Sequence, residues 1–123
     1  NMCELNRIRI FADADGSPQV RCFAVSQRLT SALCTGERIY YLKDYEAVES
    51  GKEQVPVSAD VCNVIGYLVR LNGIVKVTLK TYEFVIEIAR AFDWEDVQEN
   101  VLRIITEHLY DGLSVAVEDR TAS

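Results

Sequence analysis

Histidine, proline and closely spaced cysteines are scarce in this chain, and their scarcity removes several kinds of site. The sequence holds 1 His, 2 Pro and 4 Cys in 123 residues, and no two cysteines form a CxxC pair. Zinc and iron–sulfur sites usually draw their ligands from such close pairs of Cys or His. The sequence therefore predicts no metal site and no bound cofactor. Ligation by cysteines far apart in sequence is the weaker alternative.

The four cysteines are Cys3, Cys22, Cys34 and Cys62. Their even number allows a disulfide framework. However, the spacings are wide, and a chain of this length can fold without covalent links. We therefore expect four free, reduced thiols and an intracellular location, with cytoplasm and mitochondrion both left open.

Positive charge is in deficit, and long apolar runs are missing. The chain has 19 acidic and 13 basic residues, for a formal net charge of -6. General nucleic-acid binders and proteins held on anionic lipid need a net cationic face, so the sequence predicts neither kind of partner. No apolar run approaches the ~20 residues that cross a bilayer.

The usual signatures of catalysis are also missing. There is no glycine-rich phosphate loop, no nucleophile motif and no local Cys–His pairing. His108 falls late in a predicted helix, where it suits the negative end of the helix dipole better than the role of a base. Asp13 and Asp15 belong to a predicted turn, because no Glu closes the loop as an EF-hand calcium site requires. The sequence therefore predicts no catalytic residues and a protein that is not an enzyme.

The length fits one domain with a single core. We assign this domain to residues 2–120. Asn1 precedes Met2 and is interpreted as a cloning remnant. Residues 121–123 are expected to form a frayed tail.

The strongest patterns lie in residues 60–112, which are typical of a helix, a hairpin and a second helix. Ser58 is a candidate N-cap for the first helix, and Gly73 can end it by adopting a left-handed conformation. Gly66 either allows close packing on the sheet or is a small residue tolerated on the outer face. The helical stripe comprises Val61, Val64, Ile65, Leu68 and Val69.

The hairpin is predicted over residues 74–80 and 84–89, because apolar and polar residues alternate in both runs. The side chains expected on the dry face are Val75, Val77 and Leu79 in the first strand and Phe84, Ile86 and Ile88 in the second. Asp93 then caps the second helix, with Asp96 placed as in a capping box. Trp94 is predicted to be structural. The buried stripe of this helix is Val97, Val101, Ile104, Ile105 and Leu109.

Shorter patterns flank this unit. Residues 5–12 and 19–27 are predicted strands joined by a turn over 13–18. Ile8 and Ile10 share one face of the first strand, and Phe23 and Val25 of the second can face the core. Residues 39–45 are a candidate short strand, whose tyrosines either cover a sheet edge or form a ligand platform. Residues 46–56 are a predicted loop, and Val115 and Val117 can add an edge strand. Together these elements predict an α+β fold with two layers, in which two main helices pack on one face of an antiparallel sheet.

Several motifs follow one another along the chain, namely Leu71-Asn72-Gly73-Ile74, Val77, Phe84, Trp94, Ile105-Thr106-Glu107-His108 and Gly112. In their order and spacing they resemble the N-terminal domain of NifU-like (Nfu-type) iron–sulfur scaffold proteins. Upstream, Pro18 and Phe23 match the spacing of a further family segment, and Ser58 resembles its helix start. The family's Thr-Pro-Asn-Pro signature is reduced here to one proline, and its separate CxxC cluster-binding domain has no counterpart in this sequence. Cluster binding is therefore not transferred to any residue.

The resemblance implies a non-catalytic accessory or adaptor domain of iron–sulfur cluster assembly. Its expected partners are other proteins, either assembly components or clients that receive clusters. The alternative is a cluster-independent protein-interaction module that kept the fold, and an enzyme is the weakest of the three hypotheses. The sequence identifies neither the partner-binding residues nor the oligomeric state.

Overall fold

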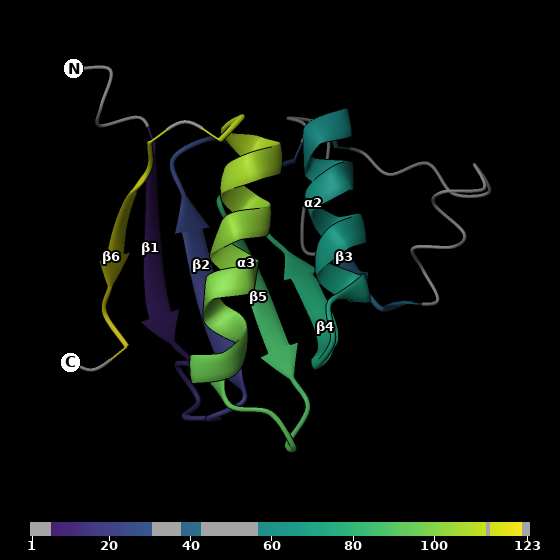
Figure 1. Ribbon diagram of the computed structural model, residues 1–123, viewed down its shortest axis with the longest axis vertical. Coiled ribbons are helices and arrows are strands. Elements are labelled where there is room, and N and C mark those ends of the chain that lie inside the picture. Colours follow the sequence, from purple (N-terminus) through teal and green to yellow (C-terminus); the bar gives the residue numbers. More distant parts are fainter. Residues whose placement is uncertain (1–5, 31–37, 43–56, 113, 122–123) are drawn as a thin grey trace.

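The computed structural model describes residues 6–30, 38–42, 57–112 and 114–121, and within them it forms two layers (Figure 1). The elements in chain order are β1 (Arg7–Ala12), β2 (Val20–Val25), β3 (Arg38–Tyr40), α2 (Ala59–Arg70), β4 (Ile74–Leu79), β5 (Glu83–Ile88), α3 (Trp94–Leu109) and β6 (Ala116–Asp119). The strands make one sheet in the order β3-β4-β5-β2-β1-β6. The two helices in the described residues, α2 and α3, lie on the same face of it (Figure 1). The predicted α+β fold with helices on one face is confirmed.

The sheet is mixed rather than purely antiparallel, which corrects one detail of the prediction. All strand pairs are antiparallel except β1 and β6, which run parallel with Ile8 opposite Val117. The predicted edge strand near Val117 is therefore present. It pairs with the first strand of the chain because α3 carries the chain back across the sheet before β6 begins.

The core lies between the sheet and the helices, as the alternation in the sequence predicts. Ile8, Ile10, Phe23, Phe84 and Ile86 are fully buried on the covered face of the sheet. The predicted stripes of both helices are buried as well, and so is Gly66. Gly66 is therefore on the packed side of α2 rather than on its outer face.

Val75 is the exception among the predicted core residues of the hairpin, because 41% of it is exposed. The ladder between β4 and β5 is irregular between Ile74 and Lys76, so that Ile74 pairs with Ile88 and Lys76 with Glu87. A bulge of this kind adds one residue to a strand and reverses the face of the side chains before it. Ile74 thereby packs against the core in place of Val75.

The two helices begin differently. The Ser58 hydroxyl accepts a hydrogen bond from the backbone N–H of Val61 at 3.3 Å, which confirms the predicted cap of α2. Asp93 occupies the N-cap position of α3, but its side chain makes no capping hydrogen bond. The predicted capping box is wrong, because the N–H of Asp96 donates to the backbone carbonyl of Asp93 instead.

Gly73 ends the turn after α2 with a φ of +97°, as predicted. A Cβ atom added at this position would lie 2.9 Å from ring atoms of Phe92. The backbone N–H of Ala89 also donates to the Gly73 carbonyl at 2.8 Å. Only glycine can adopt this backbone angle with so close a neighbour. Gly73 therefore fixes the end of α2 against the segment that follows β5.

The turn between β1 and β2 follows its prediction. The N–H of Gly16 donates to the Asp13 carbonyl at 3.0 Å, and the N–H of Ser17 donates to the Asp13 carboxylate at 3.1 Å. This use of the Asp13 side chain is typical of a hydrogen-bonded turn.

The predicted short strand at 39–45 is β3 over Arg38–Tyr40, where Tyr40 is buried and Tyr41 is 40% exposed. Cys3, Cys34, Tyr45 and the predicted loop 46–56 lie outside the described residues, as do positions 122 and 123 of the predicted tail.

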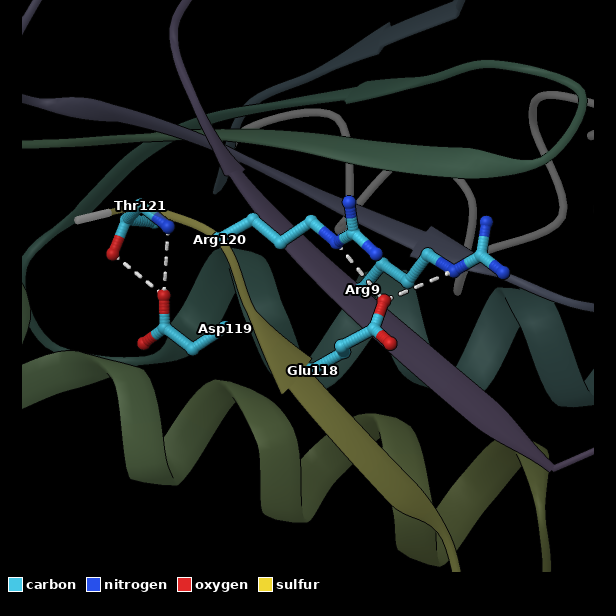
Figure 2. A network of polar contacts seen from close by, with 5 residues as sticks. All are labelled: Arg9, Glu118, Asp119, Arg120 and Thr121. Atoms are coloured by element: carbon cyan, nitrogen blue, oxygen red, sulfur yellow. Dashed lines mark hydrogen bonds and ion pairs between the residues drawn. The ribbon is translucent and has the colours of Figure 1, made fainter. Parts of the chain in front are cut away.

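A polar network lines β6 at the edge of the sheet, and one of its contacts reaches Arg9 on the neighbouring strand β1 (Figure 2). The Glu118 carboxylate lies 3.4 Å from Arg9 Nε on β1 and 3.0 Å from Arg120 Nε. Asp119 accepts hydrogen bonds from the N–H and the hydroxyl of Thr121 at 2.9 and 2.6 Å. The hydrogen bond from Arg120 lowers the pKa of Glu118, and those from Thr121 lower the pKa of Asp119.

Candidate functional site

An open groove on the outer side of the helical layer is the candidate functional site. Its volume is about 600 Å³, and it lies between the last turn of α2 and the C-terminal half of α3. The lining residues are Tyr67, Arg70, Leu71, Arg103, Ile104, Glu107 and His108. We call the hollow that these residues line the helical groove.

The helices α2 and α3 run antiparallel, and this arrangement brings the residues of the helical groove close to one another. The strand that follows α2, β4, begins at Ile74, and the strand that precedes α3, β5, ends at Ile88. Ile74 and Ile88 pair with each other, so α2 ends and α3 begins at the same end of the sheet (Figure 1). Side chains on a helix lean toward its N-terminus, so those of Tyr67 and His108 lean toward each other across the two helices. Residues 41 positions apart in sequence therefore come into contact.

The centre of the helical groove is a braced aromatic side chain. The rings of Tyr67 and His108 stack with their centroids 4.3 Å apart and their planes inclined by 12°. The Arg70 guanidinium carbon lies 5.0 Å from the centre of the Tyr67 ring, and Arg70 Nε donates to the Gly66 carbonyl at 3.1 Å. Tyr67 nevertheless stays 45% exposed. Tyr67 is thus held by the His108 ring and by the Arg70 guanidinium, while part of its own ring stays exposed in the groove.

The prediction for His108 is therefore incomplete. The residue does lie in the last turn of α3, where a cation suits the helix dipole. Its contact with Tyr67 was not predicted, because no local pattern links positions on two different helices. The available signal was that Tyr67 and Arg70 stand outside the apolar stripe of the first helix.

A second hollow of about 380 Å³ lies at the N-terminal end of α3, beside Trp94. Trp94 is 4% exposed, and its ring centroid lies 5.6 Å from that of Phe23. The Arg21 guanidinium lies 5.5 Å from the Trp94 ring and hydrogen-bonds to Gln98. These contacts join helix to sheet, which agrees with a structural role for Trp94.

This second hollow offers little to a ligand. The Trp94 Nε1 atom has no hydrogen-bond partner in the described part of the chain, but it is fully covered. A ligand in the hollow would not reach it. Two carboxylates, Asp93 and Glu95, and two arginines, Arg21 and Arg90, line this hollow, so the charges of its described lining balance.

The two cysteines inside the described ranges are free thiols. Cys22 lies on the uncovered face of the sheet, in register with Phe11 and Val85. Burial, and then the Glu83 carboxylate, raises the pKa of the Cys22 thiol, and burial raises the pKa of Cys62. Both groups therefore stay protonated near neutral pH, a state that does not suit a nucleophile.

The described residues bear on two further features, metal ligands and membrane-spanning helices. Among the described residues, no group of three or more His, Cys, Asp or Glu side chains could hold a metal ion. None of the helices in those ranges is long and apolar enough to cross a membrane.

The fold has counterparts among solved structures. No protein-family model and no curated protein matches this sequence. The chain is similar to a NifU-like protein from Saccharomyces cerevisiae, with a TM-score of 0.61 and 12% identity over 100% of this chain and 90% of that one. It is also similar to protein SAV1430 from Staphylococcus aureus, with a TM-score of 0.55 and 10% identity over 80% of this chain and 98% of the other. The chain therefore has a NifU-like fold.

Proposed function

We propose that this chain is a non-catalytic accessory domain of iron–sulfur cluster assembly that acts by binding other proteins. The observation that carries the proposal is the similarity in fold to the yeast NifU-like protein, which extends over 100% of this chain. The order of the motifs from Leu71 to Gly112 supports it from the sequence side. A shared fold alone does not assign a function, so the proposal also depends on what the surface offers.

The surface supports binding rather than catalysis. The chain's only histidine, His108, is stacked on Tyr67, and burial keeps the thiols of Cys22 and Cys62 protonated. The helical groove instead exposes part of an aromatic ring and is also lined by two arginines, and Tyr and Arg are among the residue types that dominate binding energy at protein interfaces. The proposed partners are assembly components or clients, and the domain itself is proposed to need no cofactor.

Depletion of the protein in the organism that encodes it tests this function. We expect the activity of cluster-dependent enzymes to fall while their polypeptide levels hold, and we expect the wild-type gene to restore it. Enzymes that need no cluster serve as the control. Unchanged activities of cluster-dependent enzymes after depletion would leave the chain as an interaction module unrelated to clusters.

A further inference from the structure

The charge of the helical groove differs from that of the chain as a whole. The chain carries a net charge of -6, yet the charged residues in the described lining of the groove are two arginines, Arg70 and Arg103, and one carboxylate, Glu107. An acidic protein thus has a local basic site on its outer helical face.

The first turns of α3 have the opposite sign. Glu95 and Asp96 lie in the first turn, and Glu99 is exposed one turn later. On α3, these exposed carboxylates lie near the start of the helix, whereas Arg103 lies in its C-terminal half, where the helical groove is.

The groove also has an apolar part and a fixed anchor. Ile104 is 6% exposed, and Leu71 is partly buried against the core, so that both give the groove apolar lining. Tyr67 is held by His108 and Arg70 before any ligand arrives, which reduces the entropy lost when a partner packs on it. A ligand that combines carboxylates with an apolar side chain matches both parts of the groove.

We propose that the helical groove docks a short acidic segment of a partner protein. A carboxylate of that segment pairs with Arg103, and an adjacent apolar side chain packs on Leu71, Ile104 and the exposed part of Tyr67. Nucleic acid fits less well, because a phosphate backbone needs a longer basic surface than two arginines beside a glutamate. His108 also already covers one face of the Tyr67 ring where a base would stack. This inference rests on the proposal that the chain acts by binding other proteins.

The direct test is a titration of the whole chain with a short fluorescein-labelled peptide rich in Glu and Leu. A second peptide with Lys in place of each Glu serves as the charge control, and a single-stranded oligonucleotide tests nucleic acid. We expect saturable binding of the Glu peptide alone, weakening with salt as exposed charge pairs do. Backbone NMR shifts should concentrate at Tyr67, Arg103 and His108.

Two charge reversals make the test specific. Arg103 is exposed in the groove, whereas Arg90 is exposed beside the second hollow. Arg103→Glu should weaken the Glu peptide about tenfold or more, while the matched Arg90→Glu variant, with the same change in net charge, should bind within about twofold of wild type. Thermal melting of both variants confirms that each is folded. Equal weakening by both reversals, no binding of the Glu peptide, or tighter binding of the oligonucleotide would overturn the proposal.

The same variants separate this inference from the proposed function. If depletion lowers the activity of cluster enzymes and Arg103→Glu restores it fully, the docking groove is refuted and the proposed function stands. If the peptide binds as expected while depletion leaves cluster enzymes unchanged, the groove stands and the proposed function is refuted.

Discussion

Tyr67 and Leu68 are neighbours in sequence, yet they belong to two different surfaces of the helical layer. Leu68 is fully buried against the sheet, whereas Tyr67 is 45% exposed in the helical groove. The inner surface consists of apolar side chains that any sequence with the same spacing could supply, which explains how a fold persists at 10–12% identity. The outer surface depends on particular residue types, so it is the place to look for what is specific to this chain.

The largest effect is expected on the inner surface at Trp94. Its ring is buried where α3 meets the sheet and packs on Phe23. Trp94→Ala should destabilise the domain by about 3–5 kcal/mol, measured by denaturant unfolding. An unchanged unfolding midpoint together with loss of a partner would instead make Trp94 a recognition residue.

The neighbouring pair on α2 sharpens the comparison directly. Leu68→Ala removes a fully buried side chain and should cost about 2–5 kcal/mol. Tyr67→Ala should cost less than about 1 kcal/mol, because it removes one exposed ring and its stack on His108. Only Tyr67→Ala should abolish binding of the acidic peptide while the domain stays folded. Similar stability losses for the two variants would mean that the helical groove is part of the core.

A glycine pair separates backbone strain from close contact. Gly73→Ala combines a positive φ with a clash against Phe92 and should cost about 2 kcal/mol or more. Gly16 also has a positive φ, of +84°, but an added Cβ meets nothing within 4 Å there. Gly16→Ala should therefore cost only about 1 kcal/mol. Equal losses in chemical unfolding would show that Phe92 moves aside freely.

The two helix starts provide a smaller contrast. Ser58→Ala removes the hydroxyl that caps α2 and should cost about 1 kcal/mol. Asp93→Ala removes no capping hydrogen bond, so only the attraction of its charge to the helix end is lost, about 0.5 kcal/mol. Urea unfolding of both variants measures the difference, and a larger loss for Asp93→Ala would contradict the structure at this cap.

The smallest effect concerns the sheet edge and pH. The pKa values of Glu118 and Asp119 are lowered in the folded state, by hydrogen bonds from Arg120 and from Thr121. Groups with lowered folded pKa values stabilise the fold above their unfolded pKa of about 4 and lose that contribution as the pH falls through the folded value. The protection factors of the β6 amides against hydrogen exchange should therefore fall below about pH 4, before those at the centre of the sheet. Glu118→Gln with Asp119→Asn should remove most of this pH dependence.

Most of the fold follows from local patterns in the sequence, because burial on one side of a strand or helix leaves a periodic trace. The stripes through Val64 and Val101, the Ser58 cap and the turn at Gly73 were all predictable in this way. The bulge that exposes Val75 was not, since a register shift depends on how two strands pair. The missing side-chain cap at Asp93 also depends on geometry, because the residue type alone does not decide where its carboxylate points.

The candidate site was much less predictable than the fold. The stack of Tyr67 on His108 joins two helices that run in opposite directions, so it requires the tertiary arrangement. The parallel pairing of β6, held by Glu118 to Arg9, is a long-range contact of the same kind. The sequence shows which residues stand outside the apolar stripes but not which of them meet.

We propose that this chain serves cluster assembly by binding partners rather than by holding a cluster. Anaerobic reconstitution with iron and sulfide, followed by absorption spectroscopy and metal analysis, tests it most directly. The account predicts no stable cluster and no bound zinc on the isolated chain, whether as a monomer or shared between two copies. A stoichiometric cluster that disappears on Cys34→Ser or Cys62→Ser would contradict the account and make the domain a cluster carrier.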